Sequence, residues 1–164
     1  IKWLQQKIEQ GVPLFAICFG HQLVAHMFVV KVARNVDQTK YTGVRRHLRV
    51  SGAKSFLSIP TELDLTVSHY EQAQSLPAGF ELVLTAPNTP FAAFSHREKP
   101  IFTLQAHPEF TPLFCGGRGI AVPDSFSNDH GIGLLHDFFQ FLQKSVWQIK
   151  RKIEEACIEA FFLF

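Results

Sequence analysis

The sequence has few cysteines, no basic run and no long apolar run. Its three cysteines (Cys18, Cys115 and Cys157) form no Cys-x-x-Cys pair and are odd in number, which argues against a disulfide framework. They favour a reducing compartment, and we expect a cytoplasmic protein. A net charge of +2 without clustered basic residues gives no reason to expect nucleic acid as a partner. No apolar run approaches the roughly 20 residues of a membrane span, and signal-peptide organisation is lacking, so no membrane partner is expected either.

What is present is the composition of a folded domain. Of the 164 residues, 46% are apolar and 18% are charged, and 17 are Phe against a single Met. A chain of this length buries roughly two-thirds of the surface that its unfolded form exposes. We therefore expect one domain over residues 1–164, with an aromatic-rich core. The first residue is not Met, which indicates that the chain begins inside a longer protein or a trimmed one.

The first part of the chain has the pattern of a helix, a strand and a second helix. Periodicity predicts a helix over Ile1–Gln10, which Gly11 ends. Val12–Ile17 is a continuous apolar strand of the kind that is buried on both faces of a parallel sheet. A second helix is predicted over Gly20–Phe28. This α-β-α start predicts the α/β class, with a mostly parallel sheet flanked by helices and first strands that precede this segment.

The rest of the chain carries further strand and helix signals. Turn residues such as those of Leu76–Gly79 separate short β-rich runs. These runs are Val29–Ala33, Gly43–Arg45, Leu48–Val50, Leu65–Ser68, Phe80–Thr85, Phe91–Ser95 and Ile101–Gln105. After a Gly- and Pro-rich loop over Thr111–Asp129, periodicity predicts helices over Gly133–Gln143 and Ser145–Phe161. The terminal Phe161–Phe164 is apolar on every side and needs a cover.

Cys18 lies at the turn between the predicted strand Val12–Ile17 and the following helix. Strand, sharp turn and helix form the layout that lifts a nucleophile out of an α/β sheet. The N-terminus of the helix carries a partial positive charge, which favours thiolate over thiol. The alternative is a core cysteine, since free cysteine is among the most buried residue types. The segment alone leaves both interpretations open.

A histidine and a glutamate follow the last predicted strand, Ile101–Gln105. His107 and Glu109 are two positions apart and can lie on one side of the chain. His107 could then take the proton of Cys18 and pass it to a leaving amine, with Glu109 fixing the imidazole tautomer. By itself, His-Pro-Glu is more often a strand end with a solvated charge. Its occurrence together with Cys18 favours a nucleophilic site.

Two motifs together resemble the class I glutamine amidotransferase family. Ala16-Ile-Cys-Phe-Gly-His-Gln22 matches the nucleophile motif of that family, G-x-C-x-G-x-Q, and His107-Pro-Glu109 matches its second signature. Between them, Val67–Tyr70 and Phe91–Phe94 resemble the family's middle section in the same order. The resemblance covers residues 1–110 and fades in the loop and helices of residues 111–164. It is most similar to stand-alone proteins related to the glutaminase half of GMP synthase.

The resemblance implies a flavodoxin-like α/β fold and a glutaminase activity. The side-chain amide of glutamine would be hydrolysed to glutamate and ammonia through a cysteine thioester. Carried over by motif, Cys18 is the nucleophile, His107 the general base and acid, and Glu109 its orienting partner. The backbone N–H of Phe19 would be one oxyanion donor. We expect the full-length protein to be an enzyme.

The resemblance also implies a pocket for the substrate. Gln22 would line it, while Ser68, His69 and Tyr70 lie where the main chain of the family holds the amino-acid end of glutamine. Glutamine is the expected substrate, and an ammonia-accepting synthetase or a missing N-terminal segment is a candidate partner. No cofactor and no metal are expected.

Departures from the family pattern lead to expectations of their own. Ala16 stands where the family usually has Gly, and Val29-Val30 stands where it has Gly-Gly. Because β-branched residues resist the left-handed conformation that commonly ends a helix, we expect the connection after the second helix to be reshaped. The first strands of the family, and its Gly-rich loop with the second oxyanion donor, are not found in these 164 residues. We therefore expect an N-terminally truncated version of the fold.

Two other functions remain open on the sequence. Hydrolysis of γ-glutamyl peptides uses a similar Cys-His pair on a related fold. The non-enzymatic alternative is an inactive module that binds a partner through its Phe161–Phe164 tail and an unpaired sheet edge. It is motivated by the missing oxyanion donor, because the loss of one such donor costs on the order of 100- to 1000-fold in rate.

Overall fold

A six-stranded sheet forms the body of the protein. The computed structural model describes the backbone of residues 1–161 and the side chains of residues 1–145. The strands of the large sheet are β1 (Leu14–Ile17), β3 (Tyr41–Arg49), β4 (Glu62–His69), β6 (Phe80–Ala86), β7 (Thr89–His96) and β8 (Ile101–Leu104). Their order across the sheet is β1-β8-β7-β6-β3-β4. A separate small sheet pairs β2 (Val32–Arg34) with β5 (Glu71–Ala73).

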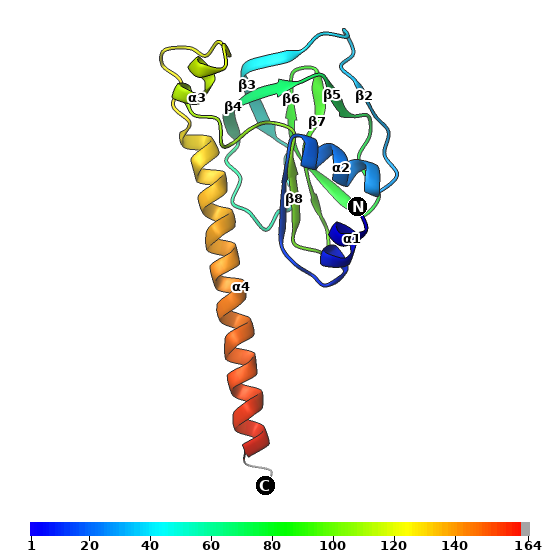
Figure 1. Cartoon of the computed structure of the whole chain (residues 1–164), viewed down its shortest axis with the longest axis vertical. Helices are drawn as coiled ribbons and strands as arrows, with labels where there is room; N and C mark the ends of the chain where they lie inside the picture. Colours follow the sequence, from blue (N-terminus) through cyan, green and yellow to red (C-terminus); the bar gives the residue numbers. More distant parts are fainter. Residues whose placement is uncertain (162–164) are drawn as a thin grey trace.

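The helices differ greatly in length. They are α1 (Lys2–Glu9), α2 (Phe19–Met27), α3 (Pro112–Gly117) and α4 (Asp129–Phe161). Figure 1 shows α4 leaving the body near α3 and continuing well beyond the sheet. Among the described residues, no helix combines the length and apolar character that crossing a membrane requires. The prediction that Phe161–Phe164 needs a cover concerns side chains outside the described residues.

The sheet is more mixed than the mostly parallel sheet that the sequence led us to expect. β1 and β8 are parallel, whereas the pairs β8–β7, β7–β6, β6–β3 and β3–β4 are antiparallel. Short connections explain two of these pairs, because Pro87-Asn88 joins β6 to β7, Arg97–Pro100 joins β7 to β8, and short connections join only antiparallel neighbours. The α/β class with flanking helices is confirmed.

Helices cover the two faces of the sheet, and strand β8 shows how. Ile101 packs in a cluster with Ile8 of α1 and Val24 of α2. The next residue, Phe102, packs in a second cluster that includes Leu134 of α4. Successive side chains of a strand point to opposite faces, so α1 and α2 cover one face and the start of α4 covers the other. All four residues of β8 are buried, as a central strand covered on both faces requires.

Local structure differs from the sequence prediction at three places. Residues 41–49, predicted as two short strands, form the single strand β3. The predicted loop over Thr111–Asp129 contains α3, whose N-cap Thr111 accepts a hydrogen bond from the N–H of Phe114 and is followed by Pro112. The two predicted C-terminal helices are one continuous helix, α4.

The connection after α2 also corrects an expectation. Val29 follows the C-cap Phe28 and adopts a φ of 65°, so the β-branched residue takes the left-handed conformation and the connection is not reshaped. The N–H groups of Val29 and Val30 donate to the carbonyls of His26 and Ala25 at 3.0 and 2.9 Å, as at a glycine-ended helix. The Val29 side chain is 95% exposed and meets no crowding, while Val30 is buried and anchors the turn.

Candidate active site

The turn between β1 and α2 holds Cys18 in a strained backbone conformation. Its φ of 47° and ψ of −100° lie outside the regions that residues with a Cβ favour. The buried Ala16 fits beside the turn, because even a Cβ added to Gly20 would lie 3.4 Å from the Cβ of Ala16, an ordinary van der Waals distance. The Ala16 departure from the family pattern is therefore accommodated without crowding.

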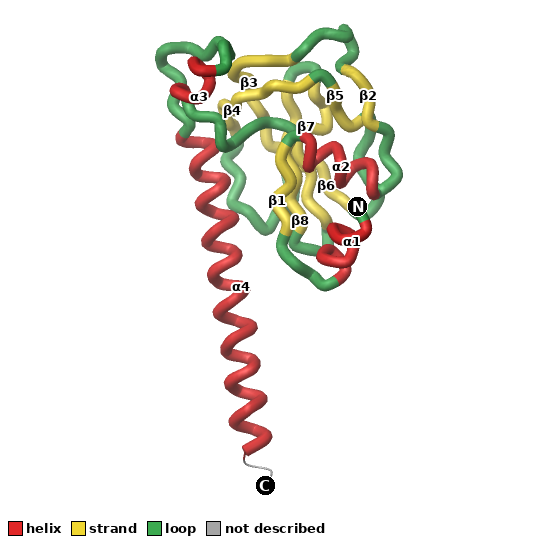
Figure 2. The backbone as a smooth tube through the Cα atoms, in the orientation of Figure 1, coloured by secondary structure: helices red, strands yellow, loops and turns green. Residues whose placement is uncertain are grey.

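The parallel pairing of β1 with β8 brings the ends of the two strands together (Figure 2). Ile17 pairs with Leu104, so the residues that follow are Cys18 on one strand and Gln105 on the other. The N–H of Cys18 donates to the carbonyl of Leu104 at 2.8 Å and extends the ladder by one step. This register places the thiol beside the segment that carries His107.

His107 is held from three directions. Its N–H donates to the carbonyl of Thr66 on β4 at 2.8 Å. Its Nδ1 lies 2.7 Å from Oε1 of Glu109, and its ring stacks on Phe110 with centroids 4.0 Å apart and planes 15° apart. Because Glu109 occupies Nδ1, Nε2 is the ring nitrogen left for Cys18. The imidazole is therefore oriented by backbone, carboxylate and aromatic ring together.

The pKa of His107 reflects these neighbours. Burial is the largest single effect and acts to lower it, but the hydrogen bonds and the charges of Cys18 and Glu109 together raise the pKa of His107 from 6.5 to about 9. The imidazole therefore carries a proton at neutral pH, between the sulfur and the carboxylate. A protonated imidazole beside a cysteine stabilises the thiolate, which is the nucleophilic form.

The predicted oxyanion donor, Phe19, and the predicted pocket residue Gln22 both belong to α2. Phe19 is its first residue and is 73% exposed, and the N–H of a first helical residue has no intrahelical acceptor. Gln22 is buried, and its Nε2 donates to the carbonyl of Glu71 at 2.7 Å and to Oε1 of Gln105 at 3.3 Å. Gln22 therefore ties α2 to β5 and to the end of β8.

The predicted segment for the amino-acid end of the substrate lies at the end of β4. Ser68 is half-buried, His69 is buried, and the Tyr70 ring is exposed. His69 Nδ1 lies 3.0 Å from the carbonyl of Glu71, which can only accept, so Nδ1 carries the hydrogen. Burial is the main cause that lowers the pKa of His69 to about 4, and the charge of His107 acts in the same direction. His69 is neutral near pH 7, and its buried Nε2 has no partner among the described residues.

The structure thus brings Cys18, His107 and Glu109 to one point, with α2 beside them. The roles assigned to these residues, and to Phe19 and the 68–70 segment, remain predictions. Sequence reasoning missed Gln105, whose Nε2 lies 3.6 Å from Cys18 Sγ. The signal was available, since two parallel strands that end together place the residues after their ends side by side.

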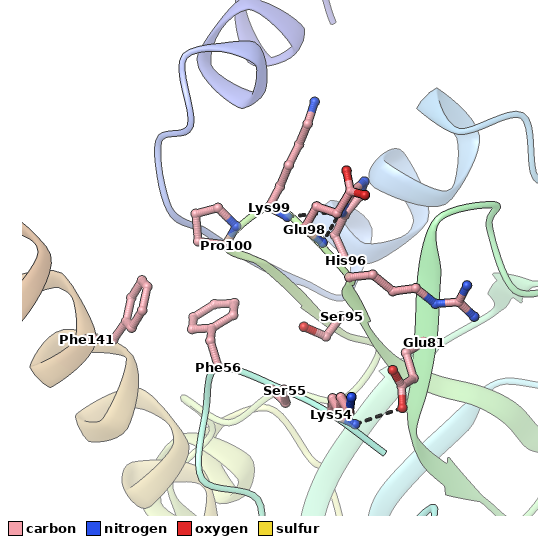
Figure 3. A pocket seen from close by; sticks show the side chains of 11 residues that line it. Lys54, Ser55, Phe56, Glu81, Ser95, His96, Glu98, Lys99, Pro100 and Phe141 are labelled. Carbon is pink, nitrogen blue, oxygen red and sulfur yellow. Dashed lines mark hydrogen bonds between the residues drawn. The ribbon is translucent and has the colours of Figure 1, made fainter. Parts of the chain in front are cut away.

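A separate pocket of about 820 Å³ lies at the opposite end of β8. Figure 3 shows Phe141 and Phe56 at the left of the pocket and Ser95 on a strand to the right of Phe56. The N–H of Lys54 donates to Glu81 at its rim. Since Ser95–Pro100 precedes β8 and Cys18 lies beyond the end of β8, this pocket does not belong to the candidate active site.

The fold and the turn at Cys18 define the general class of this protein. The chain is an α/β protein with a potential nucleophile at a strained strand-to-helix turn. The profile of the family described as "Glutamine amidotransferase class-I" matches residues 1–117. The chain belongs to the class I glutamine amidotransferase family, as its two motifs indicated.

The named relatives agree with this membership. The chain is 36% identical over 113 residues to "GMP synthase [glutamine-hydrolyzing]" from Aquifex aeolicus, covering 69% of this chain and 22% of that protein. A protein of the same name from Streptococcus pyogenes is 32% identical over 133 residues, covering 72% of this chain and 25% of that protein. The chain therefore spans about a fifth to a quarter of these relatives.

Two solved structures share the fold at lower identity. A glutamine amidotransferase from Thermotoga maritima superposes with a TM-score of 0.63 at 21% identity, over 70% of this chain and 48% of the other. A glutamine amidotransferase from Methylobacillus flagellatus superposes with a TM-score of 0.60 at 23% identity, over 70% and 45%. The expected fold is confirmed by these likenesses.

Proposed function

We propose that this site hydrolyses the side-chain amide of glutamine to glutamate and ammonia, with Cys18 as nucleophile. The observation that carries the proposal is the meeting of a strained cysteine turn with a histidine bound to Glu109 at 2.7 Å. Family membership supports glutamine as the substrate class. The name of the relatives, glutamine-hydrolyzing GMP synthase, points the same way.

The proposed chemistry has two halves. The Cys18 thiolate attacks the amide carbon, and the carbonyl electrons move onto oxygen. As the tetrahedral intermediate collapses, the C–N bond breaks and protonated His107 gives its proton to nitrogen, so ammonia leaves and a thioester remains. Water then attacks the thioester while neutral His107 takes its proton, the C–S bond breaks, and glutamate and thiolate are formed. Glu109 keeps Nδ1 occupied throughout, so Nε2 performs both transfers.

The surrounding residues have proposed roles in holding the substrate. The free N–H of Phe19, at the positive end of α2, would stabilise the oxyanion. The buried His69 ring is held at the end of β4, and the main chain of residues 68–70 would hold the amino-acid end of glutamine. Ser68 and Tyr70 flank His69 in sequence and would complete that end of the pocket.

The fate of the ammonia is part of the same proposal. The relatives are named as synthases and are four to five times longer than the matched region. A synthetase, on the same chain or on a partner, is therefore the proposed acceptor. A cytoplasmic location also belongs to the proposal, because Cys18 has to stay reduced to act.

Glutamate release from glutamine tests the proposal directly. Cys18→Ala should lower the release at least about 1000-fold, since removing the nucleophile removes the covalent route. Cys115→Ala is the matched control, because Cys115 is a buried thiol on α3 and should leave the rate within a few-fold. If Cys18→Ala keeps the rate, Cys18 is not the nucleophile.

The two alternatives are separated by the same assay. A γ-glutamyl peptide hydrolase would release glutamate from γ-glutamyl peptides faster than from free glutamine. An inactive partner-binding module would release none from either substrate, in this chain and in longer versions of it. Release from glutamine by a longer version alone would assign the missing rate to the segment that precedes residue 1.

A further inference from the structure

Gln105 is a buried polar residue for which the proposed reaction has no role so far. It follows β8 and is 0% exposed, with its N–H donating to the carbonyl of Ala92 at 2.8 Å. Its side-chain Nε2 lies 3.6 Å from Cys18 Sγ. Sulfur is larger than oxygen, so this separation is within hydrogen-bonding range for an N–H donor. The backbone bond and the β1–β8 register together place the amide beside the sulfur.

Which end of the Gln105 amide faces Cys18 follows from a chain of hydrogen bonds. The carbonyl of Glu71 can only accept, so the group of Gln22 that lies 2.7 Å from it is the NH₂. The same nitrogen lies 3.3 Å from Gln105, which must therefore present its oxygen to Gln22. The NH₂ of Gln105 is then the end that points to the sulfur. The carbonyl of Glu71 on β5 thus determines, through Gln22, that the NH₂ group of Gln105 faces the Cys18 sulfur.

We propose that Gln105 donates a hydrogen bond to the Cys18 thiolate and holds it in place, and that Gln22 is a positioning residue that fixes the orientation of the Gln105 amide. Hydrogen bonds to a charged acceptor are stronger than those to a neutral one, so this donor favours the thiolate over the thiol. Gln105 and His107 approach Cys18 as two separate donors, both carried by the segment after β8. The role in catalysis rests on the proposed glutaminase function, whereas the effect on the thiolate does not.

The pH profile of Cys18 alkylation by iodoacetamide tests this directly. The rate is followed by mass spectrometry of the Cys18 peptide, so other cysteines do not interfere. His107, which contacts Cys18, and Glu109, which bonds His107, are left unchanged in every variant. Gln105→Met keeps the length of the side chain but removes the donor. It should move the midpoint of the profile upward by about one pH unit, corresponding to a roughly tenfold weaker preference for thiolate.

Gln22→Met tests the positioning role. It frees the Gln105 amide to rotate, so the midpoint should move in the same direction by a smaller amount. The double variant should match Gln105→Met alone, because Gln22 acts only through Gln105. Gln72→Met is the matched control: Gln72 is a buried glutamine of β5 whose amide makes no hydrogen bond to Cys18 or Gln22 in the part of the chain that the structure describes. It should leave the midpoint in place.

Folding of each variant is checked by far-ultraviolet circular dichroism. An unchanged midpoint in folded Gln105→Met overturns the proposal, as does a shift of equal size in Gln72→Met. If Gln105→Met does not fold, an unchanged midpoint in folded Gln22→Met overturns it instead. Alkylation needs no glutamine turnover. If Gln105→Met shifts the alkylation midpoint as expected but the unsubstituted protein releases no glutamate, the glutaminase function is wrong and the Gln105–Cys18 contact is still supported.

Discussion

The backbone strain at Cys18 can be measured by comparing two variants that both lack the thiol. Cys18 has a φ of 47° and a ψ of −100°, and a residue with a Cβ pays about 1–3 kcal/mol to hold such a conformation. Cys18→Ala keeps the Cβ and the strain, whereas Cys18→Gly removes both. Each variant loses the same contacts of the sulfur with Gln105 and His107. Their difference in free energy of unfolding therefore isolates the strain.

The magnitude follows from two opposing effects. Glycine relieves the strain but gives the unfolded chain more freedom, which costs about 0.5–1 kcal/mol relative to alanine. We expect Cys18→Gly to be more stable than Cys18→Ala by about 0.5–2 kcal/mol. At ordinary positions the order is the reverse. Val36 serves as control, because it is 81% exposed and is not among the residues with positive φ.

Urea unfolding followed by circular dichroism measures both pairs, with m-values required to agree within each pair. Val36→Ala should be more stable than Val36→Gly by about 0.5–1 kcal/mol. The reasoning fails if the alanine variant at position 18 equals or exceeds the glycine variant while the Val36 pair behaves as expected. That result would show that Cys18 adopts this conformation without a cost in folding free energy.

Three further predictions concern the helix end and the histidine. Val29→Gly should stabilise the fold by roughly 0.5–1 kcal/mol in the same urea assay, because the exposed side chain at φ 65° loses strain and no packing, whereas Val36→Gly should destabilise it. The pKa of His107 is raised from 6.5 to about 9 on folding, so its stabilising contribution is complete below pH 6.5 and is lost as pH rises through 9. Between pH 6 and pH 9.5 the free energy of unfolding, measured in urea, should fall by about 1–2 kcal/mol after solvent screening. An equal fall in His107→Gln would show that His107 is not its source. Glu109→Gln should lower glutamate release by about 100-fold or more, since the imidazole loses its orienting carboxylate. An unchanged rate would show that catalysis does not need this carboxylate.

Local signals in the sequence were enough for the elements that flank the site. Periodicity predicted the first helix, which the structure has as α1, and the apolar run before Cys18 is β1. The turn itself could be predicted because a strand, a cysteine and a helix that starts within two residues leave little room for any other geometry. The pairing of His107 with Glu109 is equally local, since the two residues are only two positions apart.

Tertiary packing overrode local preference where burial or exposure differed from what the residue types suggest. Val29 adopts a left-handed conformation despite its β-branch, because the buried Val30 holds the turn while the Val29 side chain stays in solvent. Two short strand signals merged into β3, because pairing with β4 runs through the basic residues between them. Such outcomes depend on neighbours far away in the chain.

The sequence by itself determined the family, the cysteine turn and the His-Pro-Glu pair, because each rests on residues close together in the chain. Only the tertiary structure decided how these parts meet. The β1–β8 register sets Gln105 opposite Cys18, 87 positions away, and the carbonyl of Glu71 orients its amide through Gln22. The protonation of His107 likewise depends on burial and on two partners from different segments. Hydrogen bonds between segments and the protonation state of His107 depend on distances that are set only when the sheet forms.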